Sequence, residues 1–244
     1  MANPIMKMEE SRAEQERVIG ANEVMTVNGS IQITAFLGIM VVLAASFVWN
    51  KFTLGYTDLV SAMTLGGAVL GFVLAMIVSF TRITYLIPVY AICEGFFLGG
   101  ISAVSEHSYP GIVVQAVAGT FATLFSMLIL YRTGLIRCSD KFRSVMFIST
   151  SSVLGVYLSD FVGRFFNYSV PLINESSNLG ILLSVIVSII AALNLIIDFD
   201  FIEQGAQRMY PKKYEWFGAF GLMVTLVWLY FEILRLLAKL NSRD

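Results

Sequence analysis

Seven long apolar stretches, each of about twenty residues, run through this chain of 244 residues. A helix of about twenty apolar residues matches the roughly 30 Å hydrocarbon thickness of a bilayer, at about 1.5 Å rise per residue. Charged residues make up only 14% of the sequence, whereas soluble domains typically carry about 25%. We therefore predict an all-α, polytopic membrane protein whose seven transmembrane helices form one bundle.

Charged and turn-forming residues separate these apolar stretches. Asn50 and Lys51 end the first stretch, and Thr81 and Arg82 separate the second from the third. We place the seven spans near residues 31–50, 60–80, 84–105, 111–131, 145–166, 178–199 and 217–238. The chain then divides into a polar cytosolic tail, residues 1–30, and a transmembrane domain, residues 31–240.

The distribution of lysine and arginine predicts the orientation, because cytosolic loops carry an excess of both. With the N-terminus in the cytosol, eleven of the sixteen basic residues lie on the cytosolic side and five lie on the other side. We therefore expect a cytosolic N-terminus and a C-terminus on the opposite side.

Few side chains suit catalysis, a metal or a cofactor. His107 is the single histidine, which excludes a histidine relay and disfavours a zinc site or a Ser/His/Asp triad. Cys93 lies in an apolar span and Cys138 in a basic loop, without metal-ligand spacing. The last span, 217–238, has no lysine for retinal, and no basic stripe suggests nucleic acid. We expect no enzyme, no cofactor and no nucleic-acid partner; the partners that we expect are the lipid bilayer and a membrane protein.

Ionisable side chains inside the spans are the strongest functional signal, since each costs about 2.5–3.5 kcal/mol on insertion scales. Five carboxylates lie within or at the edges of spans: Glu94, Asp160, Asp198, Asp200 and Glu232. Asp160 and Arg164 are four residues apart and can pair on one helix face. Glu232 precedes Arg235 by three residues, which favours an interfacial pair. We treat these two carboxylates as secondary candidates.

Glu94 lies near the middle of the third span, with no basic residue within two turns. Desolvation disfavours a charged carboxylate, so we expect Glu94 to be protonated at neutral pH. Two interpretations stay open. Glu94 is either a structural group, bonded to a backbone carbonyl or to the polar cluster at 149–152, or a group on an ion path.

Asp198 and Asp200 mark the end of the sixth apolar stretch. Helical residues two apart point about 200° from each other, so we expect one to face the bundle and the other the cytosolic interface. The helix dipole disfavours an acidic group at a helix C-terminus, so local stability does not explain the pair. Carboxylate oxygens suit hard cations, which predicts a transient calcium contact or proton sensing at these residues.

Two segments resemble the Bax inhibitor-1 family, and its bacterial branch in particular. They are residues 90–102, YAICEGFFLGGIS, and residues 192–203, ALNLIIDFDFIE. The resemblance extends from about residue 30 to residue 240. It implies a seven-helix bundle with a central last helix, acting as a pH-sensitive calcium leak in the bacterial inner membrane.

The resemblance also implies roles for single residues. Asp198 matches an aspartate that, in studied members, shares a proton with an aspartate of the last span. Arg82 matches an arginine that helps to hold the closed state. The second aspartate is missing, because Val224 or Thr225 stands at its place. Three other carboxylates are candidate substitutes: Asp200, Glu94 and Glu232.

These observations predict a cation leak channel, with calcium as the permeant ion, gated by protonation of carboxylates within the membrane. The ion path or pH sensor would comprise Asp198, Asp200, Glu94 and Arg82. One alternative of another class stays open. The protein would then be a non-conducting regulator that modulates stress survival or membrane proteolysis through a partner.

Overall fold

The computed structural model describes residues 24–165 and 177–242, and within these ranges seven long helices make up the fold. They are α2 (Val27–Thr53), α3 (Thr57–Thr81), α4 (Leu86–Ser108), α5 (Ile112–Arg132), α6 (Asp140–Phe165), α8 (Asn178–Gln207) and α9 (Tyr214–Asn241). The one extended contact in the described ranges is a bridge between Val24 and Pro211. The predicted all-α, polytopic bundle is confirmed.

Six of the seven helices are long and apolar enough to cross a membrane. The exception is α6, which spans Asp140–Phe165 but is less apolar than the others. Its polar residues explain the difference, because it starts with three charged side chains within four residues and carries the cluster at 149–152. Each of the seven predicted spans therefore corresponds to a helix, and the fifth is the most polar.

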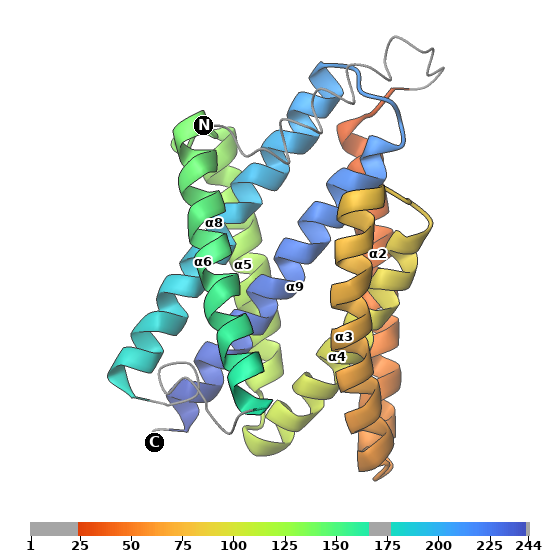
Figure 1. The fold of residues 1–244 in the computed structure, drawn as a ribbon, viewed down its shortest axis with the longest axis vertical. Helices are drawn as coiled ribbons and strands as arrows, with labels where there is room; N and C mark the ends of the chain where they lie inside the picture. Colours follow the sequence, from red (N-terminus) through yellow and green to blue (C-terminus); the bar gives the residue numbers. More distant parts are fainter. Residues whose placement is uncertain (1–23, 166–176, 243–244) are drawn as a thin grey trace.

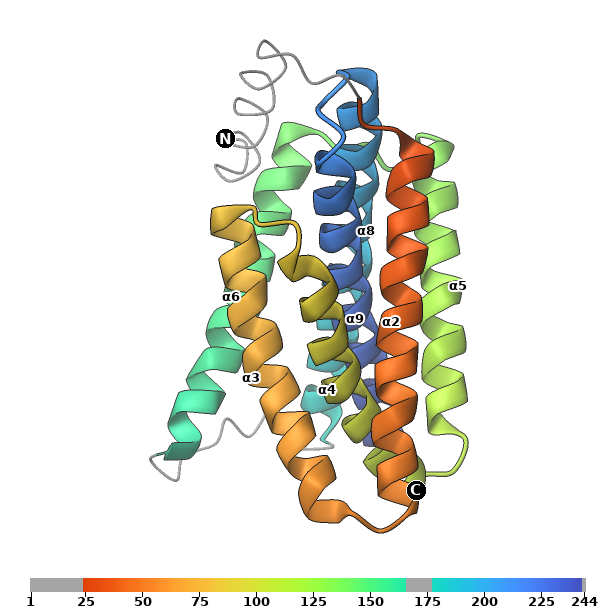
Figure 2. The same ribbon diagram turned by 90° about the vertical axis from the view of Figure 1, so that its right-hand side faces the viewer.

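The helices alternate in direction and have two shared ends. At one end, α2, α4, α6 and α9 begin (Figures 1 and 2). We call this the inner end, after the predicted orientation, and the opposite end the outer end. At the inner end Met25 N–H donates to the Tyr210 carbonyl over 2.6 Å. The Glu215 carboxylate accepts two bonds of 2.8 Å from Thr26.

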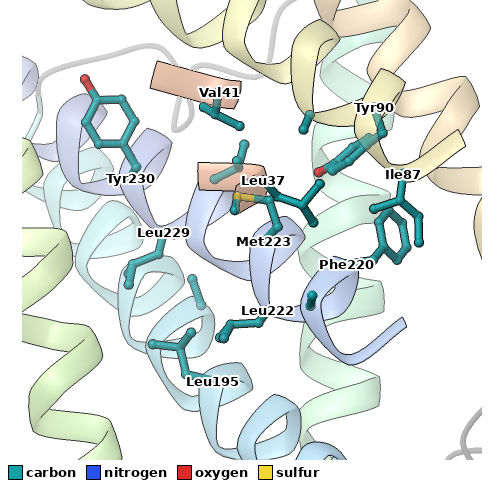
Figure 3. Packing of buried hydrophobic residues seen from close by; sticks show 14 of the residues in the cluster. Leu37, Val41, Ile87, Tyr90, Leu195, Phe220, Leu222, Met223, Leu229 and Tyr230 are labelled. Atoms are coloured by element: carbon teal, nitrogen blue, oxygen red, sulfur yellow. The ribbon is translucent and has the colours of Figure 1, made fainter. Parts of the chain in front are cut away.

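The last helix, α9, lies at the centre of the bundle, as the resemblance implies. It packs against α2, α4, α5 and α8 (Figure 2). Its neighbours meet it in one buried apolar cluster, in which Leu37, Tyr90, Leu195 and Met223 come from four different helices (Figure 3). By contrast, α6 packs mainly against α8 and α3 mainly against α4. The centre of the bundle is therefore α9, and α3 and α6 are peripheral.

Glycines let the backbones of α2, α3 and α4 approach closely. A Cβ atom at Gly95 would lie 2.6 Å from the Val41 carbonyl oxygen, and one at Gly99 would lie 2.6 Å from that of Ala45. A Cβ atom at Gly67 would overlap the α4 backbone at Cys93 in the same way. Small residues at this spacing are typical of helix pairs that associate in lipid. These glycines therefore serve packing.

The acidic pair lies inside α8 and does not end it, so the expected helix boundary is wrong. The apolar stretch ends near residue 199, but the helix continues to Gln207. The additional turns contain Glu203, Gln204 and Gln207, which are good helix formers. Hydropathy detects where the apolar surface ends, not where the helix ends, and the helix-dipole argument for Asp198 and Asp200 therefore does not apply.

Candidate functional site

Asp198 lines a cavity of about 150 Å³ between α3, α8 and α9. The cavity lies toward the inner end, where α3 ends and α9 begins. Two phenylalanines of α9 and one of α8 form its apolar wall, and Ser79 adds a hydroxyl group from the last turn of α3. The full lining is Ser79, Asp198, Phe201, Phe217, Gly218, Phe220 and Gly221. A space of this size has room for several water molecules or a partly hydrated cation.

The carboxylate of Asp198 is only partly satisfied. Its protein partner is Thr225 of α9, through a side-chain hydrogen bond. The second oxygen, Oδ2, is buried and has no hydrogen-bond partner among the described residues. Buried polar atoms in native proteins are nearly always hydrogen-bonded, so this oxygen calls for a proton, a water molecule or a cation. Of Val224 and Thr225, the two residues at the place where the resemblance implies a second aspartate, Thr225 is therefore the one that bonds to Asp198.

Asp200 faces the opposite side of α8, so the expectation that the two aspartates point apart is confirmed. Its carboxylate pairs with Arg143 of α6. It also accepts hydrogen bonds from Tyr131 of α5 over 3.3 Å and from Gln204 over 2.7 Å. Asp200 is 8% exposed, beside an inner-end cavity of about 430 Å³. The structure therefore does not bring Asp198 and Asp200 together as one calcium site.

Arg143 was not predicted as a site residue, because in the sequence it is one of several basic residues in and after the loop that precedes α6. The structure buries it and directs Nη2 at Asp200, while Nε donates to Cys138 Sγ over 3.3 Å. Cys138 lies in the loop before α6, and burial raises the pKa of its thiol to about 11. The thiol is therefore neutral at physiological pH and accepts from Arg143 as part of the same cluster.

Arg82 lies at the end of α3, three residues beyond the cavity residue Ser79. Its backbone is left-handed, with φ of 59°, a conformation that non-glycine residues seldom adopt. Its Nη1 lies 3.4 Å from the Tyr214 hydroxyl of α9. Arg82 thus links the end of α3 to the start of α9, next to the cavity. Its predicted contact with an acidic group stays a prediction.

Glu94 is 9% exposed in α4. It has a side-chain hydrogen bond with Tyr90, one turn earlier. Its carboxylate faces α3, where a Cβ atom at Gly71 would lie 2.7 Å from Oε1. Among the described residues, no hydrogen bond joins Glu94 to the polar cluster of α6, and Thr150 of that cluster accepts from Asn194 of α8 over 3.0 Å. Glu94 thus has a local partner, and its place on an ion path stays a prediction.

Glu232 is buried within the bundle, so the expected interfacial pair with Arg235 is wrong. The residue is 0% exposed. It accepts hydrogen bonds from Tyr157 of α6 over 2.7 Å and from Trp228 over 3.1 Å. The sequence could not show this burial, because the partner from α6 is 75 residues away in the chain. Arg235 lies close enough to act on Glu232 through its charge.

Asp160 is buried in α6, at 6% exposure. The predicted partner Arg164 has a side chain outside the described residues, so the predicted ion pair stays a prediction. Among the described residues, no cluster of three or more His, Cys, Asp or Glu side chains could hold a metal ion. The candidate site therefore reduces to Asp198 and Ser79 on one cavity, with Thr225 bonded to Asp198 and Arg82 beside the cavity.

Comparison with known proteins is consistent with this arrangement. The model of a family described as Bax inhibitor 1 like matches residues 3–242, nearly the whole chain. No curated protein matches the chain significantly.

Proposed function

We propose that this protein, which belongs to the Bax inhibitor 1 like family, is an integral membrane leak channel for cations. We propose calcium as the permeant ion, the bacterial inner membrane as its location, and protonation of Asp198 as the gate. The observation that carries the proposal is the buried Oδ2 of Asp198, which has no described hydrogen-bond partner and lines a cavity.

The chemistry of the cavity supports a hard cation. Asp198, Thr225 and Ser79 offer carboxylate and hydroxyl oxygens, the ligand type that calcium prefers. An ionised Asp198 attracts a cation, whereas a protonated one does not. Because burial disfavours the charged carboxylate, a modest rise in proton concentration can neutralise it. No enzyme activity or resident cofactor enters the proposal.

With Thr225 in place of a second acid, the site is better suited to letting a calcium ion pass than to holding it tightly. A single carboxylate with neutral hydroxyl neighbours binds a divalent ion less tightly than two carboxylates would. Conduction requires a site that is favourable enough to enter and weak enough to leave. We therefore expect weak calcium binding and a pH response governed by one carboxylate, Asp198.

The α3 helix is the wall that we expect to move on opening. It supplies Ser79 to the cavity, ends at the left-handed Arg82, and packs mainly against α4. By contrast, α9 is central and packs along α8, so we expect these two helices to form the fixed side of the cavity. Protonation of Asp198 can then bias α3 between two positions, as a ligand biases a two-state equilibrium. Arg82 would favour the closed position.

Calcium flux into liposomes across a pH series tests the proposal. Wild-type protein should conduct in a pH-dependent manner, and Asp198→Asn should change the flux and remove most of that dependence. Asp200→Asn should keep the pH profile, because Asp200 is paired with Arg143. Arg82→Ala should give a leakier protein. Absence of flux through correctly inserted wild-type protein would overturn the proposal and favour the non-conducting regulator.

A further inference from the structure

Polar residues recur at intervals of seven positions on α9 and fourteen positions on α8 along the contact between the two helices. On α9 they are Thr225, Glu232 and Lys239, and on α8 they are Asp198 and Ser184. Seven residues are close to two helical turns, so each set shares one face of its helix. Thr225, Glu232, Lys239 and Ser184 are all at most 7% exposed. We call this line of buried groups the α8–α9 seam.

Two contacts fix the register of the seam. At its inner end Asp198 bonds to Thr225. At its outer end Lys239 Nζ donates to Ser184 Oγ and to the Gly180 carbonyl, each over 2.9 Å. These two contacts are fourteen residues apart on both helices. The antiparallel register therefore places Glu232 midway, at the level of the small residue Ala191.

Glu232 resembles Asp198 in having one satisfied and one unsatisfied oxygen. Its Oε1 accepts from Tyr157 over 2.7 Å and from Trp228 over 3.1 Å. Its Oε2 is buried and has no hydrogen-bond partner among the described residues. Within the described chain, both carboxylate oxygens in this condition belong to the seam.

Positive charges surround Glu232 on the outer side. Of the described residues, the titratable and charged groups that act on it are Tyr157 of α6 and, from α9 itself, Arg235 and Lys239. The guanidinium group of Arg235 lies 5.4 Å from the centre of the Tyr157 ring. At the level of Glu232, α8 presents the apolar Ala191. Arg235 and Lys239 oppose both a proton and a divalent cation at Oε2, but the proton adds one positive charge and the cation two, and burial of the carboxylate favours the neutral acid.

We propose that Glu232 is a second proton-binding site on the α8–α9 seam, and that its charge sets the electrostatic barrier to cations at the outer end. Ionised Glu232 offsets the positive charge of Lys239, whose hydrogen-bond partners are the neutral Ser184 hydroxyl and Gly180 carbonyl groups. When a proton from water binds Oε2, Oε1 keeps both of its hydrogen bonds, but the carboxylate no longer offsets the positive charge of Lys239. Like charges oppose a passing cation more strongly at low dielectric, so protonation should reduce conduction.

Proton binding can be measured without any flux, because the Trp228 indole donates to Glu232. Trp49→Phe and Trp216→Phe leave Trp228 as the sole tryptophan. Its fluorescence in micelles, titrated from about pH 5 to pH 9, should show a transition that Glu232→Gln abolishes. The matched control is Glu215→Gln, a buried glutamate of the same helix that bonds to Thr26. It should keep the transition. A transition that survives Glu232→Gln would overturn the site.

Calcium flux into liposomes tests the electrostatic barrier, with variants that remove one charge or both. This test rests on the proposed function. Glu232→Gln mimics the protonated side chain and should lower calcium flux several-fold, while Lys239→Gln should raise it. The double variant should return toward wild-type flux, because it removes one charge of each sign. Equal flux in Glu232→Gln and Glu215→Gln would overturn the barrier while leaving the Asp198 gate intact. A wild-type protein without flux would overturn the channel and the barrier, but the fluorescence transition would still decide proton binding.

Discussion

Asp198 and Asp200 are two residues apart on one helix, yet their surroundings differ in nearly every respect. Asp200 has an arginine, a tyrosine and a glutamine as partners. Asp198 has one threonine and a cavity. Helical residues that are two apart point about 200° from each other. Asp200 therefore faces α5 and α6, whereas Asp198 faces α3 and α9.

This contrast shows that the role of a buried carboxylate depends on the helices that face it. A buried charge with a well-placed partner contributes to structure, and removal of that partner is costly. A buried carboxylate with an unsatisfied oxygen is available to a proton or a cation. Changes to Asp200 and its partners should therefore alter the stability of the bundle, whereas changes around Asp198 should alter the proposed conduction. Variants of each group can test this distinction.

The largest effect is expected for Arg143→Ala, which leaves the Asp200 carboxylate buried without its cation. Breaking a buried ion pair by removing one partner typically costs about 3–5 kcal/mol. The free energy of unfolding, or the melting temperature in detergent, measures this loss. Arg137→Ala, an exposed arginine of the same region, is the matched control and should change stability by at most about 0.5 kcal/mol. Equal stability of the two variants would show that the ion pair is not structural.

Replacing each aspartate by asparagine should have different effects on stability on the two faces of α8. Asp200→Asn leaves Arg143 charged and buried, and we expect a loss of roughly 2 kcal/mol, within the range for hydrogen bonds to charged groups. Asp198→Asn removes a carboxylate that is poorly solvated, so stability should be unchanged or slightly increased. Thermal unfolding of both variants, side by side, measures the contrast. If Asp198→Asn were the more destabilised protein, the assignment of roles would be reversed.

Filling the cavity should lower conduction by more than the accompanying loss of stability explains. A Cβ atom at Gly221 would lie 3.3 Å from Asp198 Oδ1, which narrows the space beside the carboxylate. Gly119→Ala is a matched control, because its Cβ atom would lie 3.3 Å from Ile233, away from the residues that line the cavity. Both variants should lose a similar amount of stability, but only Gly221→Ala should lower calcium flux several-fold. Equal flux in both would show that the cavity is not on the path.

Much of the fold was predictable from the sequence because long apolar runs and close-packing glycines are local signals. The seven predicted spans correspond to seven helices, and the central position of α9 follows the family resemblance. The boundary of α8 was not predictable from hydropathy, since its last two turns are helical but polar. The lower hydropathy of α6 was visible in its serines and charges.

The candidate site was predictable only in part. The spacing of Asp198 and Asp200 gave their opposite directions, but not which partners each would meet. Arg143 and Tyr131 come from helices 57 and 69 residues away in the chain, and no local pattern marks such distant pairs. Glu232 was misplaced for the same reason, because a nearby Arg235 suggested an interface while its actual partner is on α6.

The smallest effect is expected for Thr225→Val, which removes only the hydroxyl group facing Asp198. The side chains have nearly the same shape, so the helix packing should persist. One hydrogen bond contributes about 1 kcal/mol, so we expect calcium flux to change by about fivefold. The pH midpoint of flux should also shift, because the partner of the gating carboxylate is altered. Thr120→Val is the control, since Thr120 is also 7% exposed but bonds to its own helix at Ala116. If both variants keep the wild-type flux and midpoint, Thr225 only fills space, and Asp198 acts without a partner from α9. A midpoint shift confined to Thr225→Val would place the hydroxyl group in the gate, at the position where the family resemblance implies an acid.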